Sequence, residues 1–171
     1  MRRKGVSQEQ ADFAEFYAGS RDDCLRTVVA TVRDVDKAQD LVAEAFARAW
    51  ASWRSVSRHP APRAWVVRTA LNLSVSSWRR HRRELPLMGH DSPACGLDSG
   101  LVDTELTAVL QRLPARQRQV VALRIFLDLD TAQTAEVLGI APGTVTAHMS
   151  RALTALRTEL ATYESEGTHR E

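Results

Sequence analysis

Residues 131–157 (TAQTAEVLGIAPGTVTAHMSRALTALR) contain two helical patterns separated by a tight turn, and this arrangement restricts the fold more than any other stretch of the chain. Gly139 ends the first pattern, at a position where a left-handed backbone is cheap only for glycine. Pro142 opens the second, because proline is favoured in the first turn of a helix. Ile140 lies between them, where its side chain can pack into a hydrophobic core and anchor the turn. The stretch therefore predicts a helix-turn-helix that binds duplex DNA.

The second helix of this motif is predicted to have a buried apolar stripe and an exposed polar half near its amino end. The stripe consists of apolar residues that recur at helical spacing, namely Val145, Met149, Ala152, Leu153 and Leu156. A plain helical hairpin is the structural alternative, and an ordinary surface histidine is the alternative for His148. The candidates for duplex contact are the residues left on or near the exposed half, namely Thr144, Thr146, Ala147, His148, Ser150 and Arg151.

Helical periodicity continues through most of the chain, and no segment reads as a convincing strand. Residues 84–101 have no period and hold Pro, Gly and Ser, as expected for a linker. We therefore predict an all-α fold of two small helical domains, at 7–83 and 102–160. The predicted helices cover about 7–18, 22–33, 36–53, 62–83, 102–113, 114–126, 131–138 and 142–160.

Three local signals set the boundaries of the first helices. Ser7 with Gln10 three residues later predicts a capping box. Gly19-Ser20 predicts a break between the first helix and the second. Asp34 or Asp36 is expected to cap the third helix, because aspartate accepts hydrogen bonds from the free backbone N–H groups of a helix start.

The charge is distributed unevenly, although the net charge is only +2. Residues 45–83 carry nine arginines and no acid, whereas the segments on either side are mildly acidic. Arginine pairs well with phosphate because its planar fork matches the phosphate oxygens. A solvated basic face is the plainer explanation, but the interleaved Trp53, Trp65 and Trp78 make a nucleic-acid contact the better one.

Several classes of protein are excluded by composition. Cys24 and Cys95 are far apart and not in metal spacing, so we predict no metal, no cofactor and a reducing compartment. The basic start, Met1–Lys4, is not followed by an apolar signal segment. No run approaches the roughly 18 apolar residues of a membrane span. Paired carboxylates, a Gly-rich phosphate loop and a Ser/His/Asp set are all missing, so we predict that the chain is not an enzyme.

Two sets of motifs, in this order and spacing, give the chain a family resemblance. The first set is DLVAEAF (40–46), ARAW (47–50) and PRAWVVRTALN (62–72), followed by the arginine run; the second is the continuous stretch 113–157. Because it carries both sets, the chain resembles the extracytoplasmic-function (ECF) group of sigma-70 family RNA polymerase sigma factors over residues 10–160. The resemblance implies sigma region 2 at 7–83, a linker at 84–101 and sigma region 4 at 102–160.

The resemblance also implies partners and a place of action. The third predicted helix would dock on the β′ clamp helices of core RNA polymerase, and region 4 would meet the β flap. Asp40, Leu41, Glu44 and Phe46 fall at the matching docking positions, with a purely core role as the alternative for Leu41 and Phe46. Promoter DNA is the other partner, and an anti-sigma factor is a further one that the family allows. The expected location is the bacterial cytoplasm, with nucleoid association in holoenzyme and no membrane insertion.

The loop at 54–62 and the helix at 62–83 would read the −10 element as single-stranded DNA. Asn72 is the base-reading candidate because its amide can both donate and accept. Trp65 and Trp78 fit core positions better than stacking platforms. The phosphate-contact candidates are Arg63, Arg68, Arg79, Arg80, Arg82 and Arg83.

The recognition helix would read the −35 element as a duplex. Ser150 and Arg151, with Ala147 beside them, match base-reading positions of the family. Thr144, Thr146 and His148 match positions that contact the DNA backbone.

Four positions depart from the family pattern. Ala43 stands where glutamine is usual in the docking helix, and Ala141 replaces the usual Ser or Thr cap, which forfeits about 1 kcal/mol. Thr146 and His148 replace basic residues, so we expect weak −35 binding with a shallow salt dependence.

A helix-turn-helix regulator that works without polymerase is the alternative function. In that case residues 1–83 would serve dimerisation or sensing. Neither task requires a segment that is rich in arginine and free of acidic residues.

Overall fold

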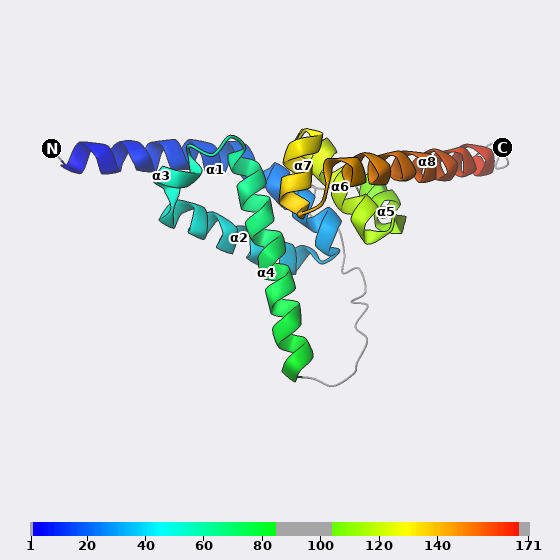
Figure 1. The fold of residues 1–171 in the computed structure, drawn as a ribbon, viewed down its shortest axis with the longest axis horizontal. Helices are drawn as coiled ribbons and strands as arrows, with labels where there is room; N and C mark the ends of the chain where they lie inside the picture. Colours follow the sequence, from blue (N-terminus) through cyan, green and yellow to red (C-terminus); the bar gives the residue numbers. More distant parts are fainter. Residues whose placement is uncertain (1, 85–103, 168–171) are drawn as a thin grey trace.

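The computed structural model describes residues 2–84 and 104–167, and these residues form helices without any strand (Figure 1). This confirms the predicted all-α class. The helices of the described part are α1 (Arg2–Val32), α2 (Val35–Ala51), α3 (Trp53–Val56), α4 (Pro62–Glu84), α5 (Thr104–Arg112), α6 (Ala115–Phe126), α7 (Thr131–Leu138) and α8 (Pro142–Gly167).

Helix α1 is longer than predicted and runs unbroken through Gly19 and Ser20. The predicted break was therefore wrong, and Ser7 lies inside the helix rather than at its cap. A glycine inside a helix costs only about 1 kcal/mol. The carboxyl half of α1 packs against α2, α4 and α6, and Ser20 is buried among them, so tertiary packing outweighs that cost.

The other predicted boundaries hold with small differences. Asp34, rather than Asp36, caps α2 by accepting from the Lys37 N–H at 2.9 Å. A short helix, α3, begins at Trp53, which was predicted to end the preceding helix, and extends into the predicted 54–62 loop. Asp130 and Gln133 form a capping box at the start of α7 that the sequence reading missed.

The amino-terminal and carboxyl-terminal parts pack against each other. Helix α1 lies along α6, and α4 contacts α7. Leu123, Leu127 and Leu129 belong to the same hydrophobic cluster as α1, α2 and α4. In the other direction, Ala30 of α1 is buried with residues of α5, α6 and α8. Two of the hydrophobic clusters of the described residues thus contain side chains from both predicted domains.

Arg33, at the end of α1, holds the left-handed backbone conformation, with φ of 66°. Such a conformation costs a residue with a Cβ about 1–2 kcal/mol and costs glycine little. Burial lowers the pKa of the Arg118 guanidinium, and the positive charge of Arg33 lowers it further. We therefore expect Arg33→Gly to raise the free energy of unfolding by about 1 kcal/mol, measured by urea denaturation.

Arg33→Ala is the matched control, because it removes the charge and keeps the backbone strain. It should stabilise the protein by less than Arg33→Gly does. Equal stabilisation by the two variants would show that the charge, and not the backbone, is responsible.

Candidate nucleic-acid interface

The turn between α7 and α8 is built as the sequence predicts. Gly139 caps α7 with φ of 63°, in the left-handed region. The Ile140 N–H donates to the Ala135 oxygen at 3.1 Å, which satisfies a free carbonyl at the helix end. Val145 of α8 is buried with Val120 of α6 and Ala135 of α7. This small core fixes the angle at which the recognition helix α8 leaves the turn.

The predicted duplex contacts lie along the amino-terminal half of α8. Thr144, Thr146, Ser150 and Arg151 are exposed, whereas Ala147 and His148 are half-buried. Arg151 forms no ion pair within the described part of the chain. These positions therefore form an accessible face with one cation on it.

His148 is oriented by its surroundings. Its Nδ1 is buried and has no hydrogen-bond partner among the described residues. The nitrogen left for an outside contact is therefore Nε2. The side chain can offer one ring nitrogen to a DNA backbone rather than two.

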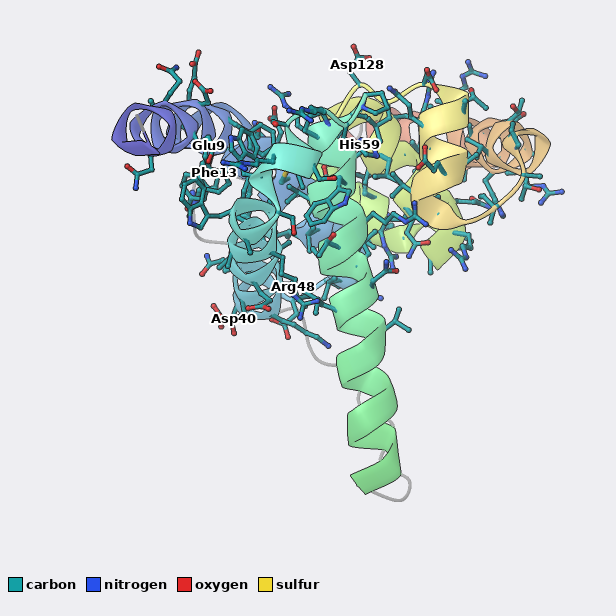
Figure 2. The ribbon with its side chains drawn as sticks, turned by 60° about the vertical axis from the view of Figure 1, so that its left-hand side comes forward. Glu9, Phe13, Asp40, Arg48, His59 and Asp128 are labelled. Carbon is teal, nitrogen blue, oxygen red and sulfur yellow. The ribbon has the colours of Figure 1, made fainter. Side chains whose placement is uncertain are left out.

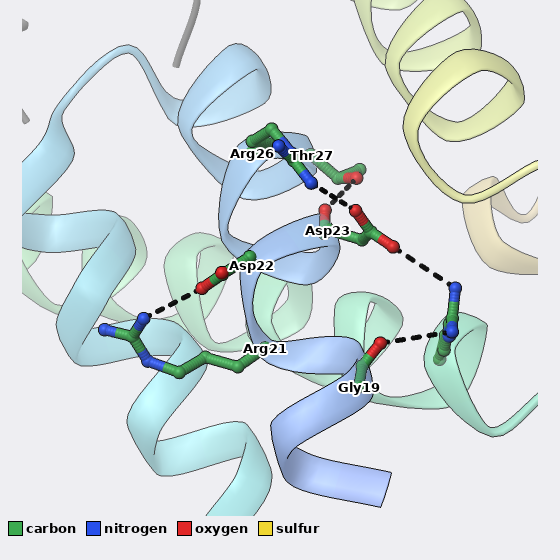
Figure 3. Close-up of polar contacts among 7 residues, drawn as sticks. Gly19, Arg21, Asp22, Asp23, Arg26 and Thr27 are labelled. Carbon is green, nitrogen blue, oxygen red and sulfur yellow. Dashed lines mark hydrogen bonds and ion pairs between the residues drawn. The ribbon is translucent and has the colours of Figure 1, made fainter. Parts of the chain in front are cut away.

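The amino end of α4 is tied to α1 through Arg63. Its guanidinium reaches Asp23 Oδ2 at 3.2 Å and donates to the Gly19 oxygen at 3.1 Å (Figure 3). Asp23 also pairs with Arg26, so the two arginines share one carboxylate. Arg63 was predicted to contact the phosphates of the −10 element. In this structure its side chain is 45% exposed, and its guanidinium already contacts Asp23 and Gly19.

Helix α4 divides into a packed half and a projecting half. Its carboxyl half extends away from the other described helices (Figure 1). Asn72 is exposed near the middle, and Trp65 packs against the core as expected. Arg68 pairs with Glu136 of α7 at 3.5 Å. The backbone of α4 carries four further predicted contacts in its last turns, with side chains outside the described part, namely Arg79, Arg80, Arg82 and Arg83.

The predicted docking residues of α2 fall on opposite sides of the helix. Leu41 and Phe46 are only 9% and 3% exposed and pack in the core. In this structure their side chains pack into the core beneath α2 and are not accessible on its surface. Asp40 and Glu44 are exposed, and Glu44 pairs with Arg48 at 2.8 Å. Figure 2 shows Asp40 on the side of α2 that lies away from α4.

An aromatic cluster joins α1 to α2 beside this face, and the sequence reading missed it. Phe13 lies 5.1 Å from Trp50 between ring centroids, and Tyr17 meets Phe46 edge-on at 4.9 Å. Tyr17 and Trp50 remain 39% and 41% exposed. The spacing of Phe13, Phe16 and Tyr17 on one helix face was the available signal.

Other kinds of site find no support in the described residues. They contain no cluster of His, Cys, Asp or Glu able to hold a metal ion. None of the helices described is both long and apolar enough to cross a membrane.

Comparison with known proteins gives the same two-part division. A family model of sigma-70 region 2 matches residues 17–84, and one of sigma-70 region 4 matches residues 103–156. The RNA polymerase sigma-E factor of Streptomyces coelicolor is 34% identical over 155 residues, which cover 89% of this chain and 88% of that protein. The ECF RNA polymerase sigma factor SigW of Bacillus subtilis is 26% identical over 175 residues, which cover 92% of each.

Two solved structures share the fold. One is the sigma factor RpoE of Bartonella quintana in complex with the anti-sigma factor NepR, with a TM-score of 0.69, 24% identity and coverage of 88% of this chain and 97% of that one. The other is CnrH in complex with the cytosolic domain of CnrY, with a TM-score of 0.63, 21% identity and 90% coverage of each chain. By its motifs, its helices and its relatives, the chain belongs to the ECF group of sigma-70 family RNA polymerase sigma factors, which are transcription initiation factors and not enzymes.

Proposed function

We propose that this chain binds core RNA polymerase and directs it to promoters, with α4 reading the −10 strand and α8 reading the −35 duplex. The observation that carries this proposal is the presence, in one chain, of a well-formed helix-turn-helix and of a helix, α4, whose last two turns carry four arginines. A protein that binds only duplex DNA would need only the helix-turn-helix. A reader of melted DNA needs phosphate-binding cations and a group that can hydrogen-bond a base, which α4 carries.

The −35 contact is assigned to the exposed half of α8. Arg151 is the residue able to form a paired contact to a guanine edge, and Ser150 can bond either a donor or an acceptor. Thr144, Thr146 and His148 lie where backbone contacts are expected and supply little positive charge. The affinity of the isolated chain for its −35 site is therefore low, and most of it comes from the assembled holoenzyme.

The −10 contact is assigned to α4, from Arg68 to its projecting carboxyl end. Asn72 is the base reader, and the cations Arg68, Arg79, Arg80, Arg82 and Arg83 track the phosphates. Arg63 joins them in this proposal only after it exchanges its contact with Asp23 for a phosphate.

The polymerase contact is assigned to the outer face of α2. Asp40 and Glu44 offer the charge, and the half-exposed Trp50 offers an apolar edge to the same partner. Such a face suits the basic helix pair of the β′ clamp, and the β flap is assigned to the carboxyl-terminal part. Because the similar solved structure of RpoE holds the anti-sigma factor NepR, an anti-sigma factor is also proposed as a partner. The place of action is the bacterial cytoplasm.

Run-off transcription with purified core polymerase tests the proposal. The chain should direct initiation from a subset of promoters that core alone ignores. Tight binding to duplex DNA without any initiation would instead support a regulator that acts without polymerase.

Arg151→Ala tests the base-reading role within that assay. We expect initiation at promoters that depend on the −35 element to fall about 10- to 100-fold, because a paired arginine–guanine contact contributes about 1–3 kcal/mol of discrimination. Arg157→Ala is the matched control, since Arg157 is exposed on the same helix two turns later. Equal losses in the two variants would indicate a general charge effect and no base reading.

A further inference from the structure

A cavity of about 700 Å³ opens beside the middle of α1. Its walls come from α1, from the start of α4 and from the turn that joins α6 to α7. A volume of this size is typical of the sites in which proteins bind small molecules. Among its described lining residues, only Arg63 is also a side chain proposed to contact DNA.

The floor of the cavity is apolar and buried, apart from one hydroxyl. Leu127 and Leu129 line it and are 6% and 5% exposed. Ser20 of α1 lines it as well and is only 2% exposed, yet its hydroxyl has no hydrogen-bond partner within the part of the chain that the structure describes. Because an unpaired hydroxyl at a buried position is costly, Ser20 can stabilise a polar group that enters the cavity.

The rim of the cavity is acidic. Its carboxylates, here called the rim carboxylates, are the exposed Asp12 and Glu15 of α1 and Asp128 of the α6–α7 turn. None of the three forms an ion pair with another described residue. Arg63 also lines the cavity, but its charge is already paired with Asp23. The rim therefore attracts a cation and repels an anion.

The distance from rim to floor suits a small elongated molecule. Glu15 and Ser20 are five residues apart on α1, which is about 7.5 Å along the helix axis. Phe16, a half-buried residue, lies between them in the sequence and lines the same cavity. An aromatic side chain at this place can pack against a flat apolar group and can also attract a neighbouring cation.

We propose that this cavity binds a small aromatic amine. The ammonium group lies among the rim carboxylates, the ring packs against Phe16 and Leu127, and a polar group at the far end of the ligand pairs with Ser20. An anion of the same shape is rejected by the rim. Binding needs only the free chain, so this proposal does not rest on the proposed function in transcription.

Tyramine is the probe for this site, because it carries an ammonium group, an aromatic ring and a hydroxyl in that order. It is titrated into the isotope-labelled full chain, and the backbone amide signals are followed by nuclear magnetic resonance. We expect saturable shifts confined to amides that surround the cavity, including those of Gly19, Ser20 and Leu129.

Two relatives of tyramine test the two polar ends of the ligand. Phenethylamine lacks the hydroxyl and should bind about 3- to 10-fold more weakly, which is the effect of one lost hydrogen bond. The other relative, 4-ethylphenol, lacks the ammonium group and should bind about 10-fold more weakly or less tightly still, because contacts to charged groups contribute more.

Gly19→Met should abolish the binding of tyramine and keep the fold. A Cβ at Gly19 meets no atom within 4 Å, so the new side chain can enter the cavity without a clash. Methionine also favours a helix more than glycine does. Gly143→Met is the matched control, since Gly143 lies in a helix, has the same open space around it and does not line the cavity. It should bind tyramine as the wild-type chain does.

Two polar variants assign the contacts. Asp128→Asn removes one rim carboxylate and should weaken tyramine binding about 3- to 10-fold while leaving 4-ethylphenol unaffected. Asparagine tolerates the left-handed backbone of residue 128, whose φ is 50°, so the turn keeps its shape. Ser20→Ala should remove the preference for tyramine over phenethylamine, a change that a general loss of structure would not cause.

Four outcomes would overturn the proposal: no saturable shifts near the cavity, equal affinity for 4-ethylphenol and tyramine, unchanged tyramine binding in Gly19→Met, or its loss in Gly143→Met. Run-off transcription separates this proposal from the proposed function. Absence of initiation would overturn that function, while the titrations of the free chain would still decide whether the cavity binds an aromatic amine.

Discussion

Leu123→Ala is expected to lower the free energy of unfolding by about 2–5 kcal/mol, because it removes a fully buried side chain and leaves a cavity. Leu123 is 0% exposed on α6 and lies in the cluster formed mainly by α1, α2 and α4. For a chain of this size, each kcal/mol lowers the melting temperature by about 2–4 °C. The expected decrease is therefore about 4–20 °C, measured by circular dichroism at 222 nm.

Ile125→Ala is the control for this experiment, since it makes a similar truncation at a half-exposed position of the same helix. It should change the melting temperature by no more than about 2 °C. A small effect of Leu123→Ala would mean that this side chain is not buried in solution. That result would count against the packing of α6 on α1.

The local elements could be predicted because their signals lie within a few residues of one another. Gly139, Pro142 and Asp34 each act on the adjacent backbone, and each boundary appears where its residue places it. Helix α1 shows where this reasoning ends. The cost of Gly19 in a helix is local and small, whereas the packing that overrides it comes from α2, α4 and α6, which lie far away in sequence.

The packing of the two parts was not predictable from periodicity. An apolar stripe shows that a helix face is buried but not which element covers it. Leu127 and Leu129 lie in a turn and belong to no stripe, yet they enter the core of the other part of the chain. Ala30 is equally uninformative in sequence, because alanine suits both a surface and a close helix contact.

The candidate site was anticipated at the level of elements rather than side chains. On α8, the spacing correctly separated the buried Val145 from the exposed Thr144 and Ser150, but it wrongly placed Leu153, which is 38% exposed, in the buried stripe. On α2, the docking assignment mixed exposed acids with the buried Leu41 and Phe46, because a family position does not say which way a side chain points. The roles of these residues in binding stay predictions.

Reversing the charges on the outer face of α2 should cause the largest functional loss. We expect Asp40→Lys with Glu44→Lys to weaken binding to core polymerase about 100-fold or more, since like charges placed against a basic partner cost several kcal/mol. Both residues are exposed, so the effect on folding should be small. Within the helix, the new lysine at 44 faces Arg48, which costs only about 0.2–0.5 kcal/mol.

Asp12→Lys with Glu15→Lys is the matched control, because it makes the same change in net charge at two exposed positions of α1. Affinity for fluorescently labelled core polymerase, measured at low and moderate salt, should fall sharply only in the α2 variant. The wild-type affinity should weaken as salt rises, and that of the α2 variant should weaken less, because its attractive contacts are already gone. Equal losses in both variants would locate the attraction in the overall charge of the protein, and the outer face of α2 would then not be the docking surface.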